Sequence, residues 1–178
     1  MSTDAFLRAV AAGALTAAGL ACAAGPDLGK PLAEAEVAPL AISVFPDGRG
    51  LPPGRATAVD GVDAYLRHCA LCHGTRGQGK PGPALAGGLG SLATKSPVRT
   101  VGSYWPYATT LFDYIRRSMP YDAPMSLTDE EVYGVTAYVL WTNGVIGRDT
   151  VLDATSLPGV RMPNRAGFVN AWDEPARR

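Results

Sequence analysis

One pentapeptide restricts this chain more than any other feature. Residues 69–73 read CALCH, which is the C-x-x-C-H pattern of Cys69, Cys72 and His73. On a helical turn the two sulfurs lie on one face, where both can form thioethers with the vinyl groups at a porphyrin edge. The imidazole next to the second cysteine is then directed at the iron. The pattern therefore predicts one covalently bound haem c with His73 as an axial ligand.

Other uses of C-x-x-C fit the sequence less well. A structural zinc ion needs four ligands, but after residue 24 the chain has only these two cysteines and two histidines, His68 and His73. A thioredoxin-like redox pair would follow a strand within alternating strands and helices, and no such pattern surrounds the motif. A non-haem C-x-x-C module is therefore the weaker alternative.

Length and composition predict one mostly helical domain with extensions. The 178 residues suffice for a single core. The 21 glycines and 15 prolines exceed the roughly 12% of average usage, which predicts many loops and little sheet. Sixteen basic residues balance sixteen acidic ones, so nucleic acid is not expected as a partner.

Residues 1–24 resemble a secretory signal peptide. The stretch AVAAGALTAAGLACAA, which ends at Ala24, is uncharged and closes in small residues. Export to a bacterial periplasm is therefore expected. Membrane association is expected only if Cys22 is lipidated, as the GLAC sequence suggests, or if the segment is retained as an anchor.

Composition divides the remaining chain into three parts. Residues 25–57 are rich in Pro, Gly and Ala and predict an extended arm. This arm is either a free linker or partly packed on the domain, and its apolar residues favour packing; they are Leu40, Ile42, Val44 and Phe45. Residues 58–147 form the domain. Residues 148–178 form a tail without clear periodicity, which we expect on the surface.

Three helices are predicted within the domain. The first begins at Ala58, and the second spans residues 107–118 because Pro120 prevents its continuation. The third follows a capping box formed by Thr128 and Glu131. Their expected apolar stripes are Val59, Val62, Leu66 and Cys69; Leu111, Tyr114, Ile115 and Ser118; and Val132, Val135, Thr136 and Val139.

The second axial ligand follows by elimination. His68 lies on the attachment segment itself and cannot reach the opposite face of the haem, so methionine is the ligand type that remains. Met119 directly follows a helix and precedes Pro120, which favours it over Met125. Either thioether could instead fill a gap in the haem pocket. Met162 lies in the tail.

With these residues, the sequence resembles a class I cytochrome c over residues 57–147. The resemblance implies an all-α fold of three to four short helices around one covalent haem, with the arm and the tail as extensions. It assigns Met119 as the sixth ligand, the Pro83 carbonyl as the group that orients His73, and Leu85 as a packing residue on the haem. The residues that match the family's contact between the first and last helices are Gly61, Tyr65 and Tyr138.

Longer segments resemble a narrower group, the cytochrome subunits of bacterial sulfite and sulfane dehydrogenases. The matching segments read VFPDGRGLPPG, VGSYWPYATTLFDYIRRSMPYDAPMSLTDEEVYGVTAYVLWTNGVI and MPNRAGF. In these systems a molybdenum subunit oxidises sulfur and passes electrons to the haem protein. The sulfane type carries a second haem region, whereas this sequence has one C-x-x-C-H motif, so the resemblance implies the monohaem sulfite type.

The resemblance implies an electron-transfer protein and not an enzyme. Such a protein would accept single electrons from a molybdenum sulfite dehydrogenase-like subunit and pass them to a downstream cytochrome or oxidase. Two protein ligands on the iron would leave no position for a substrate. The alternatives are a general diffusible periplasmic carrier and an enzyme with open iron.

Aromatic residues supply two further expectations. Trp105, with Tyr104 and Tyr107, is expected to line the haem pocket or to pack in the core. Trp105 or Arg116 is expected to reach a haem propionate. The tail carries Phe168 and Trp172, which are candidates for contact with a dehydrogenase subunit.

Overall fold

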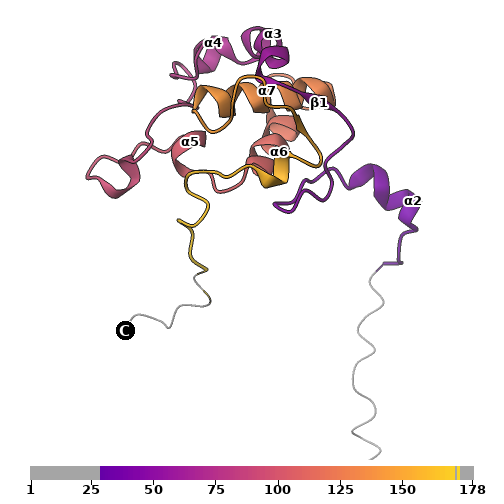
Figure 1. Cartoon of the computed structure of the whole chain (residues 1–178). Helices are drawn as coiled ribbons and strands as arrows, with labels where there is room; N and C mark the ends of the chain where they lie inside the picture. The colour runs from indigo at the N-terminus through magenta and orange to yellow at the C-terminus, as the bar shows by residue number, and fades with distance from the viewer. Residues whose placement is uncertain (1–28, 171, 173–178) are drawn as a thin grey trace, which may run out of the picture. The chain divides into compact units, whose positions relative to one another are not determined.

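Short helices and loops make up most of the structure, a computed structural model that describes residues 29–170 and 172 (Figure 1). The expected signal peptide, residues 1–24 with Cys22, lies outside these residues. The helices are α2 (Glu34–Val37), α3 (Ala58–His68), α4 (Ala70–His73), α5 (Val101–Tyr104), α6 (Ala108–Ser118) and α7 (Asp129–Thr142). The 3-10 helices are η1 (Ala38–Leu40), η2 (Ser91–Ala93) and η3 (Leu157–Gly159), and the strands are β1 (Arg55–Ala56) and β2 (Leu152–Asp153).

The chain divides into two compact units, and the boundary lies after Leu40. The described part of the first unit, residues 29–40, contains α2 and η1 and is exposed throughout. Its helix is capped locally, because the Glu36 carboxylate accepts a hydrogen bond from the Ala33 amide at 2.9 Å. The second unit begins at Ala41 and contains the C-x-x-C-H motif.

Helix α7 is the centre of the second unit. All of its residues from Val132 to Leu140 are buried, so α3 and α6 can pack on different sides of it (Figure 1). The predicted capping box is confirmed: the Thr128 hydroxyl accepts from the Glu131 amide at 3.2 Å, and the Glu131 carboxylate accepts from the Thr128 amide at 3.1 Å. The four residues of the predicted stripe are buried, together with the rest of that segment.

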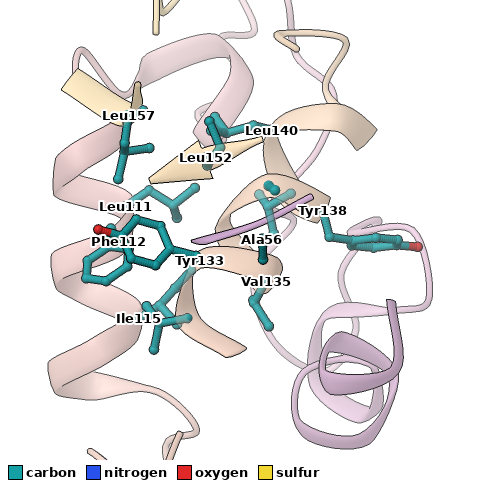
Figure 2. Close-up of a cluster of buried hydrophobic side chains, with 14 of the residues drawn as sticks. Ala56, Leu111, Phe112, Ile115, Tyr133, Val135, Tyr138, Leu140, Leu152 and Leu157 are labelled. Carbon is teal, nitrogen blue, oxygen red and sulfur yellow. The ribbon is translucent and has the colours of Figure 1, made fainter. Parts of the chain in front are cut away.

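The crossing of α3 and α7 depends on two glycines. A Cβ atom on Gly134 would lie 2.8 Å from the Gly61 Cα atom, so only residues without a side chain allow this approach. One turn further on, the rings of Tyr65 and Tyr138 pack with centroids 4.5 Å apart. Tyr138 extends from α7 toward α3 in Figure 2.

The predicted apolar stripe of α3 is wrong for Val59 and Leu66, whereas Val62 packs against the core and Cys69 is buried. The face that packs on α7 consists of Ala58, Gly61, Ala64 and Tyr65. Val59 and Leu66, which belong to the expected stripe, are 40% and 45% exposed. Periodicity alone favoured the larger aliphatic residues, but the close approach at Gly61 turns the small-residue face inward.

Helix α6 packs on α7 through a partly different face than predicted. Leu111 and Ile115 are buried as expected, whereas Tyr114 is 46% exposed. Phe112, absent from the predicted stripe, is fully buried, and its ring centroid lies 4.5 Å from that of Tyr133. Figure 2 shows these side chains gathered between α6 and α7.

The tail supplies part of the core, so the expectation of a purely superficial tail is wrong for its first half. Leu152 and Leu157 are fully buried, and Met162 is 3% exposed. Strand β2 pairs antiparallel with β1, placing Leu152 opposite Ala56. The segment before α3 and the segment after α7 therefore meet beside α7, as Figure 2 shows for Ala56, Leu152 and Leu157.

Within the described residues, no helix is both long and apolar enough to span a bilayer.

Candidate haem-binding site

The C-x-x-C-H motif lies at the junction of α3 and α4. Cys69 is the C-cap of α3 and the N-cap of α4. Cys72 and His73 lie within α4. The His73 amide donates to the Cys69 carbonyl at 2.9 Å, which closes the helical turn that the motif requires. The two cysteines form no disulfide with each other; Cys69 is buried and Cys72 is exposed.

The imidazole of His73 is oriented by the loop that follows it. Its Nδ1 atom lies 2.7 Å from the Pro83 carbonyl oxygen, so Nδ1 carries the proton and donates to that carbonyl. The lone pair on Nε2 is then available to a metal. Gly82 allows the loop to come this close, because a Cβ atom there would lie 3.2 Å from the His73 Cε1 atom.

Two buried tyrosines hold the chain directly after His73. The Tyr65 hydroxyl donates to the Gly74 carbonyl at 2.9 Å, and the Tyr138 hydroxyl donates to the Thr75 carbonyl at 2.8 Å. Burial raises the pKa of Tyr65 to about 12, so its phenol remains a donor at neutral pH. These two hydrogen bonds could not be predicted from local sequence patterns, although both rings were expected at the helix contact.

Leu85 is fixed by the end of α7. Its amide donates to the Gly77 carbonyl at 2.8 Å, and its carbonyl accepts from the Asn143 Nδ2 atom at 3.0 Å. Asn143 also accepts from the Gly87 amide at 3.2 Å. Sequence reasoning missed this role of Asn143, because an Asn at a helix end is equally typical of a simple C-cap.

The three described methionines have different environments. Met119 caps the C-terminal end of α6, donates its amide to the Ile115 carbonyl at 3.0 Å, and packs half-buried against the core. Met125 is 57% exposed and has a φ of +62°. Met162 is enclosed in the core. Of the three, Met119 alone is half-buried at a helix end.

The expected pocket aromatics lie between α5, α6 and the tail. Trp105 is half-buried, and its ring meets that of Tyr114 edge to face at 5.8 Å. Tyr104 packs against Phe168 of the tail at 5.2 Å. The guanidinium of Arg116 donates to the Asp129 carboxylate, with an Nε–Oδ1 distance of 3.1 Å.

Comparisons with known proteins assign the family. The family model described as cytochrome c matches residues 58–143. A chain in the crystal structure of the sulfane dehydrogenase SoxCD from Paracoccus pantotrophus is 38% identical, with a TM-score of 0.77, over 84% of this chain and 75% of that one. This chain belongs to the cytochrome c family. A comparison with curated proteins gave no match.

Family membership establishes several of the expectations from sequence. The cytochrome has the class I all-α fold and carries covalently bound haem c. It is an electron carrier, as the family implies. The likeness to SoxCD also confirms the predicted resemblance to cytochromes of sulfur-oxidising systems.

The residues of this cytochrome fit a covalent haem. Porphyrin nitrogens already surround haem iron, so the protein has to provide two axial ligands and two thiols. His73 offers a free Nε2 atom, and Cys69 and Cys72 lie on one helical turn beside it. Among the described residues there is no group of three or more His, Cys, Asp or Glu side chains that could hold a metal ion directly.

The environment of Cys69 argues against a dithiol redox site. Burial raises the pKa of its thiol to about 11, and the nearby Cys72 acts in the same direction. Catalytic thiols of the thioredoxin type have lowered pKa values, because the thiolate is the nucleophile. The raised pKa of Cys69 therefore does not fit a catalytic thiol of that type.

Proposed function

We propose that this chain is a periplasmic monohaem cytochrome that accepts single electrons from a molybdenum sulfite dehydrogenase-like subunit and passes them to a downstream cytochrome or oxidase. The observation that carries the proposal is the likeness to a chain of SoxCD, which is named as a sulfane dehydrogenase; it supports a dehydrogenase partner, whereas the choice of the sulfite type rests on the single C-x-x-C-H motif. That likeness covers 84% of the chain, a larger share than residues 58–143 of the family match, so it includes residues outside the haem domain.

In this proposal Cys69 and Cys72 hold the haem through thioethers, and His73 and Met119 are the two axial ligands. Haem supplies the capacity to take up and release one electron. Pro83 keeps the His73 ring oriented with Nδ1 as the hydrogen-bond donor, and histidine–methionine ligation favours a raised potential. With both axial positions filled by protein, electron transfer is favoured over substrate chemistry.

Exposed apolar side chains on the tail support a lasting contact with the dehydrogenase. The start of this segment is anchored, because Asn164 Nδ2 donates to the Tyr104 carbonyl at 2.8 Å and the Arg165 guanidinium lies 4.1 Å from the centre of the Tyr107 ring. Beyond it, Phe168 is 49% exposed and Trp172 is 94% exposed. Aromatic residues of this kind are typical anchors of protein interfaces.

Co-purification from the native periplasm tests the partnership. We expect the cytochrome to elute with a molybdenum dehydrogenase at both low and high salt. Elution of the cytochrome alone under both conditions would contradict a permanent subunit. Stopped-flow reduction by a purified sulfite dehydrogenase then distinguishes the alternative: a rate equal to that of an unrelated cytochrome would favour the general diffusible carrier.

Alanine replacement of each methionine tests the ligand assignment. Met119→Ala should abolish the long-wavelength absorption band that a sulfur–iron bond gives the ferric protein, and it should lower the reduction potential. Met125→Ala is the matched control and should keep the band, because its side chain is largely exposed. Loss of the band in Met125→Ala with retention in Met119→Ala would reverse the assignment.

A further inference from the structure

Residues 42–46, which we call the strap, run along α6; residues 42–45 have no regular secondary structure, and a turn begins at residue 46. Three hydrogen bonds connect the strap backbone to side chains of the helix. They are Arg116 Nη1 to the Ile42 carbonyl at 3.3 Å, the Val44 amide to Asp113 Oδ1 at 2.8 Å, and Thr109 Oγ1 to the Pro46 carbonyl at 3.3 Å.

The spacing of these contacts shows a regular register. Every second strap residue takes part, namely Ile42, Val44 and Pro46. The partners on α6 are four and three residues apart, the spacing of one helical face. The order is antiparallel, because the first strap residue meets Arg116 near the end of α6 and the last meets Thr109 near its beginning.

Asp113 is the central member of this register. Its carboxylate is buried, accepts the Val44 amide, and is compensated by Arg117, whose Nε donates to Oδ1 at 3.0 Å. A buried carboxylate is tolerated when its charge is paired and its oxygens are hydrogen-bonded. Removing it would leave both the Val44 amide and a guanidinium without their acceptor.

Arg116 connects the strap to the methionine loop, residues 119–128. Besides the Ile42 carbonyl, it binds Asp129, the first residue of α7. The two ends of the loop are therefore joined at their base by one side chain. The loop between them is open to solvent, since Tyr121 is 87% exposed and Met125 is 57% exposed. The position of Met119 is then set by the end of α6 and by the packing of Met119 on the core.

We propose that Asp113 and Arg116 are positioning residues for the Met119 thioether, acting by holding α6 against the strap and against the start of α7. The inference rests on the Met119–iron bond of the proposed function. Weakening the register should loosen the end of α6 and make Met119 easier to displace, although neither side chain touches Met119 in the contacts described.

Imidazole titration of the ferric, full-length holoprotein tests this role. Imidazole competes with Met119 for the iron, and displacement is followed by loss of the sulfur–iron absorption band. We expect Asp113→Ala and Arg116→Gln each to strengthen apparent imidazole binding about tenfold, which corresponds to about 1.4 kcal/mol. The control is Asp47→Ala, which removes an exposed carboxylate paired with Arg49 just beyond the strap; its affinity should stay within about twofold of the parent.

The outcomes separate this inference from the ligand assignment. If Met119→Ala keeps the band, the ligand assignment fails and the inference fails with it. Met119→Ala could lose the band while Asp113→Ala and Arg116→Gln bind imidazole like the parent. In that case the contacts between α6 and the strap are only structural, even if the unfolding midpoints of the two variants fall. Should Asp113→Ala fail to accumulate as holoprotein, Arg116→Gln decides alone, because the Arg116 side chain is partly exposed and easier to replace.

Discussion

Gly61 is the single residue at which one added methyl group should do most damage. An alanine Cβ there would run into the backbone carbonyl of Gly134, which cannot move aside like a flexible side chain. Alanine favours a helix over glycine by about 1 kcal/mol, whereas overpacking of a tight contact costs about 1–3 kcal/mol or more. The steric cost should exceed the gain in helix propensity, because the added Cβ atom would meet backbone atoms of Gly134.

We therefore predict that Gly61→Ala lowers the free energy of unfolding of the holoprotein by about 2 kcal/mol in a denaturant titration. Gly159→Ala is the control, since that glycine is exposed and a Cβ atom there meets nothing within 4 Å. A Gly61→Ala protein as stable as the control would show that α3 and α7 can separate without cost.

The haem-attachment residues were predictable from sequence because their chemistry requires a fixed local spacing. Cys69, Cys72 and His73 lie on one helical turn of a short segment, so no tertiary information was needed to recognise them. Asn143 and Tyr138 act on backbone groups about sixty residues away in the chain, at Leu85 and Thr75. Contacts of that kind depend on the packing of whole helices, and a local pattern cannot specify them.

Among the elements, α7 shows why helix positions were easier to predict than helix faces. Its start is encoded by the adjacent Thr128 and Glu131, and its hydrogen bonds are local. The inward face of a neighbouring helix depends on what α7 offers, and α7 is buried on all sides from Val132 to Leu140. The glycine contact, and not the aliphatic stripe of Val59 and Leu66, therefore orients α3.

The Thr128 cap gives a prediction at the scale of this element. Thr128→Ala removes the acceptor for the Glu131 amide, and loss of an N-cap side chain typically costs about 1 kcal/mol. Chemical denaturation of the holoprotein should show this loss. Thr155→Ala is a suitable control because Thr155 is exposed in a loop and begins no helix; an equal effect in both variants would argue against the cap.

For the whole molecule, carboxylates with lowered pKa values predict sensitivity to acid. Burial alone would raise the pKa of Asp113, but hydrogen bonds from Arg117 and from the Val44 amide outweigh it and hold the pKa below the usual 3.8. Hydrogen bonds from Thr57 likewise lower the pKa of Asp60. Each group stabilises the fold while the pH is above 3.8, and this contribution is lost as the pH falls through the folded-state pKa.

We predict that the urea midpoint of the holoprotein changes little between pH 6 and pH 5 and falls steeply below about pH 4. Asp113→Ala should be less stable at pH 6 and should show a smaller further loss on acidification, because the group that titrates is missing. A parallel acid profile in parent and variant would mean that other carboxylates account for the acid lability.

The register between strap and helix has a consequence for chain length. The three strap contacts span four residue steps, whereas their partners on α6, from Thr109 to Arg116, span seven steps, or about 10.5 Å of helix. One residue inserted after Ser43 would displace Val44 from its buried position and move the Pro46 carbonyl away from Thr109, while the Ile42 contact with Arg116 would stay in place. Insertions and deletions should therefore be excluded from residues 42–46 although the segment has no regular secondary structure.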